Sequence, residues 1–120
     1  MNLLWNTIHV NDLYESIKFY ENVLGLKLSK KFNAGPNQIA FLHAGNIQIE
    51  LIQSDEDTNI SHGQHISLGF SINSVDSTIN ELSKKGVNIY SGPFKPNPHV
   101  KFFFIKDPNG VLIQLVEQVK

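Results

Sequence analysis

Side chains that could bind a ligand or move a proton recur at alternate positions of several short segments that are typical of β-strands. Because successive strand residues point to opposite faces of a sheet, this alternation predicts that the polar set shares one side. The set comprises Trp5, Thr7, His9, Gln48, Glu50, His65, Ser67 and Gln114. Glu50 is the candidate catalytic residue, since a carboxylate there could accept hydrogen bonds from a cationic or amide-bearing ligand, or act as a general base.

The composition limits this chemistry. The chain of 120 residues has no cysteine, which excludes disulfides, thiolate metal sites and a cysteine nucleophile. Any metal would therefore rest on His, Asp, Glu or weaker amide ligands. All of the basic residues are lysine, so the guanidinium fork that best holds carboxylates and phosphates is missing. The net charge is −1, which disfavours a nucleic-acid partner.

Hydropathy and the first residues bear on the compartment. The sequence has no apolar run of the ~18 residues that a membrane-spanning helix needs, so no membrane association is expected. The first six residues carry no basic segment of the kind that begins a secretory signal. We therefore expect a cytoplasmic protein.

The elements that must position these side chains occur twice along the chain. In the first half, Asp12 with Glu15 three residues later predicts a helix start, and Gly25 predicts its end. The strands expected around this helix cover residues 3–10, 26–29, 39–43 and 47–53. In the second half a helix is expected from Val75 to Gly86. The strands expected around it cover residues 65–72, 87–90, 101–105 and 111–116.

The order of elements is βαβββ in both halves, and residues 47–52 match residues 111–116 most closely. We predict one α+β domain over residues 1–120, built from tandem modules at 1–54 and 62–120, with an acidic, solvated connector at 54–62. The uniformly apolar side of the strands is expected to face the helices. The polar side is expected to line a cleft or to form an outer surface, because the alternation is typical of both.

Two segments carry a resemblance to a known family: residues 12–26, Asp-Leu-Tyr-Glu-Ser-Ile-Lys-Phe-Tyr-Glu-Asn-Val-Leu-Gly-Leu, and residues 104–115, Phe-Ile-Lys-Asp-Pro-Asn-Gly-Val-Leu-Ile-Gln-Leu. The chain resembles the vicinal oxygen chelate (VOC) superfamily, which includes glyoxalase I, extradiol dioxygenases, fosfomycin-resistance enzymes and bleomycin-resistance proteins. The resemblance implies that paired βαβββ modules form a curved mixed sheet around a cleft, with the helices outside. It also implies a homodimer, with the cleft formed within one chain or by exchange of modules between two.

The resemblance further implies four positions that hold a divalent metal in the family's enzymes, usually as His, Glu, His and Glu. By spacing they fall here on Trp5, Glu50, Ser67 and Gln114. Only Glu50 is a strong ligand, so we expect no metal cofactor. An alternative set, displaced along the strands, is His9, Glu50, His65 and Gln114, and it would hold Ni, Zn, Mn or Fe. The other histidines, His43, His62 and His99, are expected at the surface.

Three functional hypotheses follow. The first is a small-molecule-binding protein that sequesters a drug or metabolite without a metal, as bleomycin-resistance proteins do in antibiotic resistance. The aromatic residues that could add an apolar wall to its cleft are Trp5, Phe41, Tyr90, Phe102 and Phe104. For residues 102–104 the pattern favours a place in the core, with at least one of the three on the cleft side. The second is a metal-dependent, glyoxalase-like lyase, isomerase or transferase that uses the displaced set. The third is a structural or regulatory module with an empty cleft.

Overall fold

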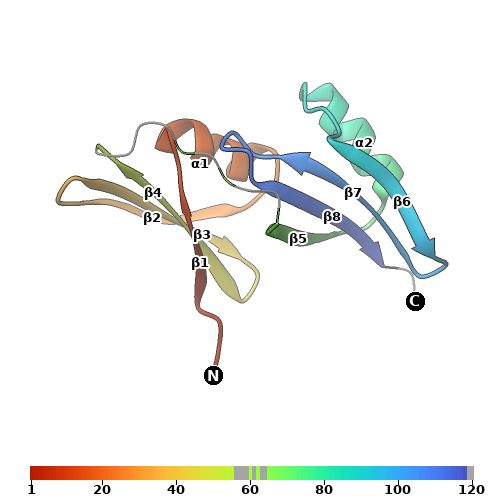
Figure 1. The fold of residues 1–120 in the computed structure, drawn as a ribbon, viewed down its shortest axis with the longest axis horizontal. Coiled ribbons are helices and arrows are strands. Elements are labelled where there is room, and N and C mark those ends of the chain that lie inside the picture. The colour runs from red at the N-terminus through yellow and green to blue at the C-terminus, as the bar shows by residue number, and fades with distance from the viewer. Residues whose placement is uncertain (56–59, 61, 63–64, 119–120) are drawn as a thin grey trace. The chain divides into compact units, whose positions relative to one another are not determined.

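The computed structural model describes residues 1–55, 60, 62 and 65–118. Two compact units divide the chain, unit 1 at Met1–Ser61 and unit 2 at His62–Lys120. Each unit has one helix and one four-stranded sheet in the order βαβββ (Figure 1). The prediction of an α+β fold with two tandem βαβββ modules is therefore confirmed. Within the predicted connector, Glu56 and Asp57 lie outside the described residues.

Unit 1 contains a mixed sheet. Its elements are β1 (Trp5–His9), α1 (Leu13–Asn22), β2 (Lys27–Ala34), β3 (Asn37–Ala44) and β4 (Ile47–Ser54). The strand order is β1-β4-β3-β2. The first strand runs parallel to β4, whereas β4, β3 and β2 are joined as antiparallel neighbours. This arrangement brings the first and last strands of the module together in the sheet, although about 40 residues separate them in sequence.

Unit 2 repeats this topology. Its elements are β5 (Ser67–Ile72), α2 (Val75–Lys84), β6 (Ser91–Asn97), β7 (Val100–Lys106) and β8 (Leu112–Gln118). The strand order is β5-β8-β7-β6, with β5 parallel to β8 and the other pairs antiparallel. The two units therefore share one pattern of strand pairing, as expected for a duplicated module.

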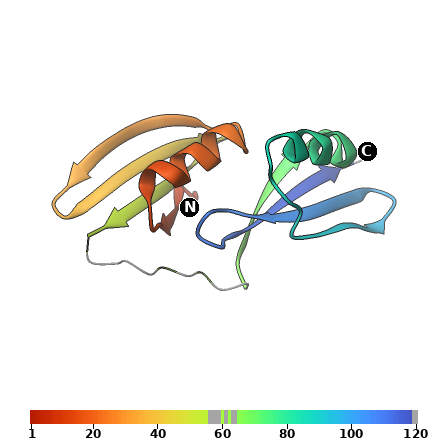
Figure 2. The same cartoon turned by 90° about the horizontal axis from the view of Figure 1, so that it is seen from above.

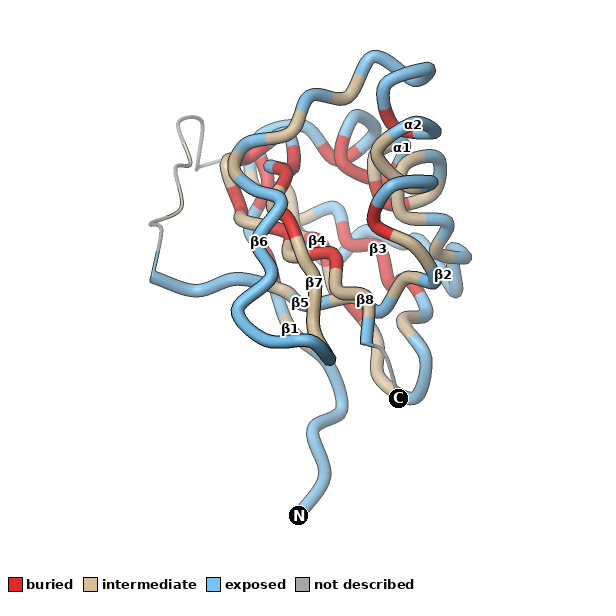
Figure 3. Tube along the Cα trace, turned by 90° about the vertical axis from the view of Figure 1, so that its right-hand side faces the viewer, coloured by how far each residue is buried: buried red, intermediate tan, exposed pale blue. Residues whose placement is uncertain are grey.

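The core of each unit lies between its helix and one face of its own sheet (Figures 2 and 3). In unit 1 the helix buries Leu13, Ile17 and Tyr20, and the strands bury apolar residues such as Ile8 and Leu51. In unit 2 the strand residues buried to the same degree are Phe103, Ile105, Ile113 and Leu115. The apolar alternation predicted for the helix side of the strands is thus present in both modules.

Each helix begins with the same two hydrogen bonds, one that caps the helix and one that joins it to its sheet. The side chains of Asp12 and Ser74 accept hydrogen bonds from backbone N–H groups three residues later, at 2.9 and 3.1 Å. The first helical residue, Leu13 in α1 and Val75 in α2, donates its N–H to a side chain of the module's last strand. The acceptors are Gln53 in unit 1 and Glu117 in unit 2, each at 2.7 Å.

Within the described residues, both helices fall short of the length that crossing a membrane requires.

We expect Glu117→Ala to lower the free energy of unfolding by about 1–2 kcal/mol, because it removes a charged acceptor from a partly buried helix N-terminus. Urea denaturation followed by circular dichroism measures the change. The substitution Glu117→Gln keeps an acceptor and should lose less, and the exposed neighbour Gln118 replaced by alanine should lose almost nothing. Equal midpoints for the Glu117→Ala and wild-type chains would contradict the anchoring role.

Two strands predicted for unit 2 differ in the structure. Residues 87–90 are not a strand, and β6 instead covers Ser91–Asn97, which contains Pro93 and Pro96. Proline cannot donate a backbone hydrogen bond, so a segment with two prolines is not expected within a sheet. The strand is nevertheless accommodated because β6 is an edge strand with irregular pairing, in register with β7 at only three positions. His65 also lies outside its predicted strand, since β5 begins at Ser67.

Candidate functional site

The side of the unit 1 sheet that faces away from α1 carries a row of four side chains. In the order β1-β4-β3-β2 they are Thr7, Glu50, Phe41 and Lys30, each in register with the next. A strand's alternate residues share a face, so Trp5 and Gln48 stand beside this row on β1 and β4. The row combines a hydroxyl, a carboxylate, an aromatic ring and an ammonium group.

On this side the ring of Phe41 contacts two other aromatic rings. Trp5 meets Phe41 edge to face, with ring centroids 5.4 Å apart, and Phe32 stacks on Phe41 at 6.3 Å. The Lys30 ammonium lies 4.9 Å from the Phe41 ring centroid and 5.8 Å from that of Phe32, within range of a cation–π attraction. Phe41 is buried, whereas Trp5 and Phe32 keep 45% and 40% of their surface exposed. A planar ligand therefore finds accessible aromatic surface on both sides of Phe41.

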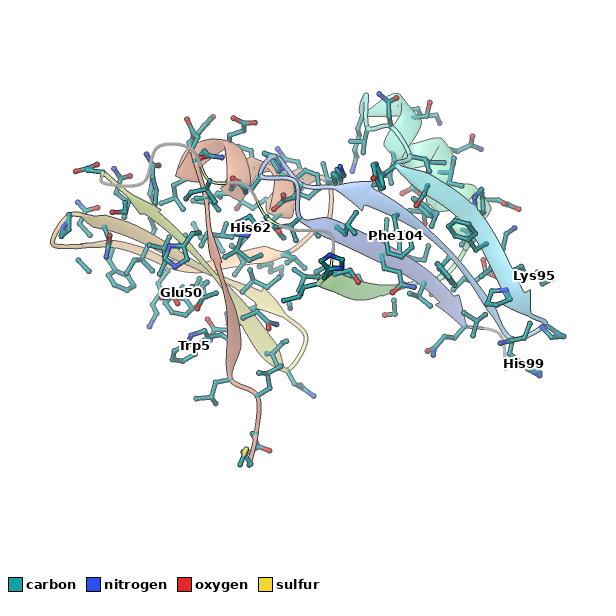
Figure 4. All side chains as sticks on the ribbon, in the orientation of Figure 1. Trp5, Glu50, His62, Lys95, His99 and Phe104 are labelled. Atoms are coloured by element: carbon teal, nitrogen blue, oxygen red, sulfur yellow. The ribbon has the colours of Figure 1, made fainter. Side chains whose placement is uncertain are left out.

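Glu50 is hydrogen-bonded inside the row. The Thr7 hydroxyl donates to Glu50 Oε1 at 2.6 Å, which fixes the carboxylate on the face that it shares with Trp5 (Figure 4). Two residues before it on β4, the side-chain oxygen of Gln48 is buried and has no hydrogen-bond partner among the residues that the structure describes. Buried polar atoms are rarely left unpaired, because the loss of water is not compensated. The face thus carries a carboxylate that is partly hydrogen-bonded, and beneath it an amide oxygen that is buried and unpaired.

The equivalent side of the unit 2 sheet carries a second row. In the order β5-β8-β7-β6 it comprises Gly69, Gln114, Phe104 and Ser91. A Cβ atom at Gly69 would lie 3.8 Å from Gln114 Oε1, which is an ordinary van der Waals contact. The ring centroid of Phe102 lies 5.8 Å from that of Phe104 and 5.5 Å from that of Phe94. Unit 2 therefore also presents an aromatic group beside a polar side chain.

The two rows occupy corresponding places in the duplicated topology. Glu50 on β4 corresponds to Gln114 on β8, and Phe41 on β3 corresponds to Phe104 on β7. Phe32 and Phe94 occupy corresponding positions on the outer strands. Phe32 pairs with Ile39 and Phe94 with Phe102, each two residues before the phenylalanine of the row. The aromatic side chains are thus repeated along with the backbone, whereas the polar positions differ between the units.

The remaining predicted site residues are placed as follows. The exposed His9 ends β1 next to Ile52 of β4, and Ser67 begins β5. His65 is exposed and precedes β5. Tyr90 lies outside the aromatic group of unit 2, with the Lys106 ammonium 4.0 Å from its ring centroid.

Sequence reasoning missed Lys30, Phe32 and Phe94. The first two lie beyond the predicted strand at 26–29, because a register shift between Leu28 and Lys30 interrupts the alternation. The signal available for β2 was the apolar-charged-apolar series at positions 28, 30 and 32. Phe94 lies between the two prolines of β6, which concealed that strand.

In the ranges that the structure covers, no group of three or more His, Asp or Glu side chains is arranged to hold a metal ion. Of the metal-ligating types predicted for the site, unit 1 contributes Glu50 and His9, and unit 2 contributes His65 together with the amide of Gln114. On the unit 1 face, the residues in register with Glu50 are Thr7 and Phe41, and the next positions along the strands hold Trp5, Gln48 and His43. These groups favour contact with an organic molecule.

Comparison with known protein families gives one match over nearly the whole chain. Residues 2–115 match the model of the Glyoxalase/Bleomycin resistance protein/Dioxygenase superfamily. A probable lactoylglutathione lyase of Synechocystis sp. is 32% identical over 128 aligned residues, which cover 98% of this chain and 95% of that protein.

Solved structures with the same fold include two glyoxalases. The trypanothione-dependent glyoxalase I of Leishmania major superposes with a TM-score of 0.83 at 25% identity, covering 98% of this chain and 86% of that one. A mutant of glyoxalase I from Zea mays gives a TM-score of 0.87 at 24% identity, but this chain covers only 46% of that longer one. The second likeness concerns the fold alone.

Proposed function

The chain belongs to the Glyoxalase/Bleomycin resistance protein/Dioxygenase superfamily, and on that premise we propose that it binds a small amphipathic organic molecule, a drug or metabolite, without a divalent metal. The proposed binding surfaces are the strand faces that point away from the helices. They include Trp5, Thr7, His9, Gln48, Glu50, Ser67 and Gln114, with His65 just before β5.

The observation that carries this proposal is the position of Trp5 and the contact of its ring with Phe41. This residue occupies the position of the family's first metal ligand by sequence spacing, and its ring is engaged with Phe41. An indole has an N–H donor and no free lone pair for a metal, but it offers a large flat apolar surface. The substitution therefore exchanges a coordinating side chain for one suited to an organic ligand.

The residues at the other three expected metal positions also favour an organic ligand over a metal ion. Ser67 and Gln114 supply a hydroxyl and a neutral amide where two strong ligands are usual in the family. The one carboxylate, Glu50, already accepts a hydrogen bond from Thr7. Catalytic metal sites typically keep three good protein ligands, so this donor set does not fit the family's metal. The exposed rings of Trp5 and Phe32 in unit 1 and of Phe94 in unit 2 instead suit an amphipathic molecule that has an apolar body and a few polar groups.

Metal content and Trp5 fluorescence test the proposal together. We expect protein purified without chelator to contain far less than one Ni, Zn, Mn or Fe per chain by elemental analysis. Trp5 is the only tryptophan, so its emission should change when an amphipathic ligand from a panel of drugs and metabolites binds. The control is Tyr14→Phe, at an exposed position of α1, which should respond as the wild type does. Stoichiometric metal that is lost in a His9→Ala, His65→Ala double variant would overturn the metal-free proposal.

A glyoxalase-like lyase is the second candidate, favoured by the 32% identity to a probable lactoylglutathione lyase. Its metal set would be His9, Glu50, His65 and Gln114, with Glu50 also available as a general base. An assay of lactoylglutathione lyase activity with each of the four metals added decides between the candidates. Lyase activity that disappears in Glu50→Gln would establish the second candidate. The metal-free proposal predicts that the wild-type chain has no lyase activity with any of the four metals. A homodimer and a cytoplasmic location remain predictions for both.

A further inference from the structure

We propose that the unit 1 face recognises the N–H edge of a planar aromatic cation, of the amidine or amino-heteroaromatic class. This inference rests on the proposed function and names the chemistry of its ligand. It starts from the one buried side-chain atom in the described part of the chain that lacks a hydrogen-bond partner, Gln48 Oε1. The oxygen is covered by its neighbours, so a ligand reaches it only after a neighbouring side chain moves, and an N–H group donated to it then removes the penalty of an unpaired buried acceptor.

A second acceptor stands next to it. Glu50 follows Gln48 by two residues on β4, so the two side chains share a face with Cα atoms about 7 Å apart. Thr7 occupies Oε1 of Glu50, which leaves lone pairs of the carboxylate for a further donor. Two neighbouring acceptors, one of them charged, match a ligand group that has several N–H donors and a positive charge.

Aromatic rings flank these acceptors. The register sets Trp5 beside Gln48 and Phe41 beside Glu50, and the two rings contact each other at 5.4 Å. Trp5 keeps enough exposed surface to stack with a flat ligand body. The electron-rich ring faces also attract a cation, which adds to the attraction of the carboxylate.

Charge distribution further separates ligand classes. Lys30 lies at the far end of the row, with Phe41 between it and Glu50, and its ammonium already faces two rings. A carboxylate ligand placed at Gln48 and Glu50 would be repelled by the negative charge of Glu50, so anions should be rejected at this place. Planar aromatic cations should therefore bind in preference to their neutral and anionic analogues.

Three probes of nearly equal shape test this order: benzamidinium, benzamide and benzoate. We expect Trp5 fluorescence titrations at constant ionic strength to give the tightest dissociation constant for benzamidinium and the weakest for benzoate. Gln48→Met should weaken benzamidinium about five- to tenfold, the value of one hydrogen bond, while leaving the thermal midpoint equal or higher, because an unpaired acceptor is removed. A purely structural Gln48 would show the reverse, with a lower midpoint and unchanged binding.

Two further substitutions serve as comparisons, one outside the proposed site and one within it. Gln38→Met makes the same exchange at an exposed residue on the opposite face of β3 and should leave both readouts unchanged. Glu50→Gln should reduce the preference for benzamidinium over benzamide about tenfold, because it removes the charge and keeps the shape. Benzoate binding as tightly as benzamidinium, or none of the probes binding at their highest soluble concentrations, overturns the inference. Failure of the proposed function has a separate sign, which is stoichiometric metal or lyase activity.

Discussion

Replacing Trp5 with histidine, Ser67 with histidine and Gln114 with glutamate in one chain is expected to give a protein that retains one divalent metal ion per site. By sequence spacing, the three substitutions put the residue types that are usual in the family at the positions expected for its metal ligands, with Glu50 as the fourth. Three strong ligands added to one carboxylate should raise the affinity for Ni or Zn at least ~1,000-fold, which corresponds to about 4 kcal/mol. Elemental analysis after gel filtration and titration with a chromophoric chelator measure the gain.

The matched control adds Glu50→Gln to the triple variant, which should lose most of the gained affinity because its only native strong ligand becomes an amide. A triple variant that folds but gains no affinity would show that the positions carried over by spacing are not the metal positions. A wild-type chain that binds as tightly as the triple variant would favour the displaced set of His9, Glu50, His65 and Gln114 instead.

The second large effect concerns stability. We expect Phe103→Ala to lower the free energy of unfolding by about 3–5 kcal/mol, because Phe103 has no exposed surface and lies on the strand face that packs against α2. The adjacent Phe102 points to the other face and is only partly buried. Phe102→Ala should therefore cost about 1–2 kcal/mol. Urea denaturation of the two variants side by side makes the comparison.

Near-equal losses for Phe102→Ala and Phe103→Ala would contradict the facing of β7, on which the assignment of Phe104 and Gln114 to one side depends. The ligand experiments provide an independent check. Phe103→Ala acts on the packed face, so any chain that remains folded should still bind an amphipathic ligand at the unit 1 face with unchanged affinity.

Local sequence patterns were sufficient for much of the fold. The apolar alternation predicted which side of the strands packs on the helices, and the helix starts expected after Asp12 and at Val75 agree with the structure. The match of residues 47–52 to 111–116 predicted that Glu50 and Gln114 occupy corresponding strand positions, which the pairing of both sheets bears out. These features succeed because facing and capping depend on residues close together in sequence.

Edge strands were harder to predict. The structure places β6 at Ser91–Asn97 and β2 up to Ala34, whereas the sequence pattern favoured residues 87–90 and 26–29. An edge strand pairs on one side only and tolerates prolines and register shifts, so its sequence carries a weak strand signal. Lys30, Phe32 and Phe94 were consequently absent from the predicted site.

The sequence by itself determined the duplicated βαβββ plan, the exclusion of thiolate and guanidinium chemistry, and the side of the strands on which Trp5 and Glu50 lie. Only the tertiary structure decided which of these side chains meet. The pairing of β1 with β4, from opposite ends of a module, brings the Thr7 hydroxyl onto Glu50, and the pairing of β2 with β3 brings Lys30 and Phe32 onto Phe41. Such contacts follow from the register between strands distant in sequence, which no local pattern specifies.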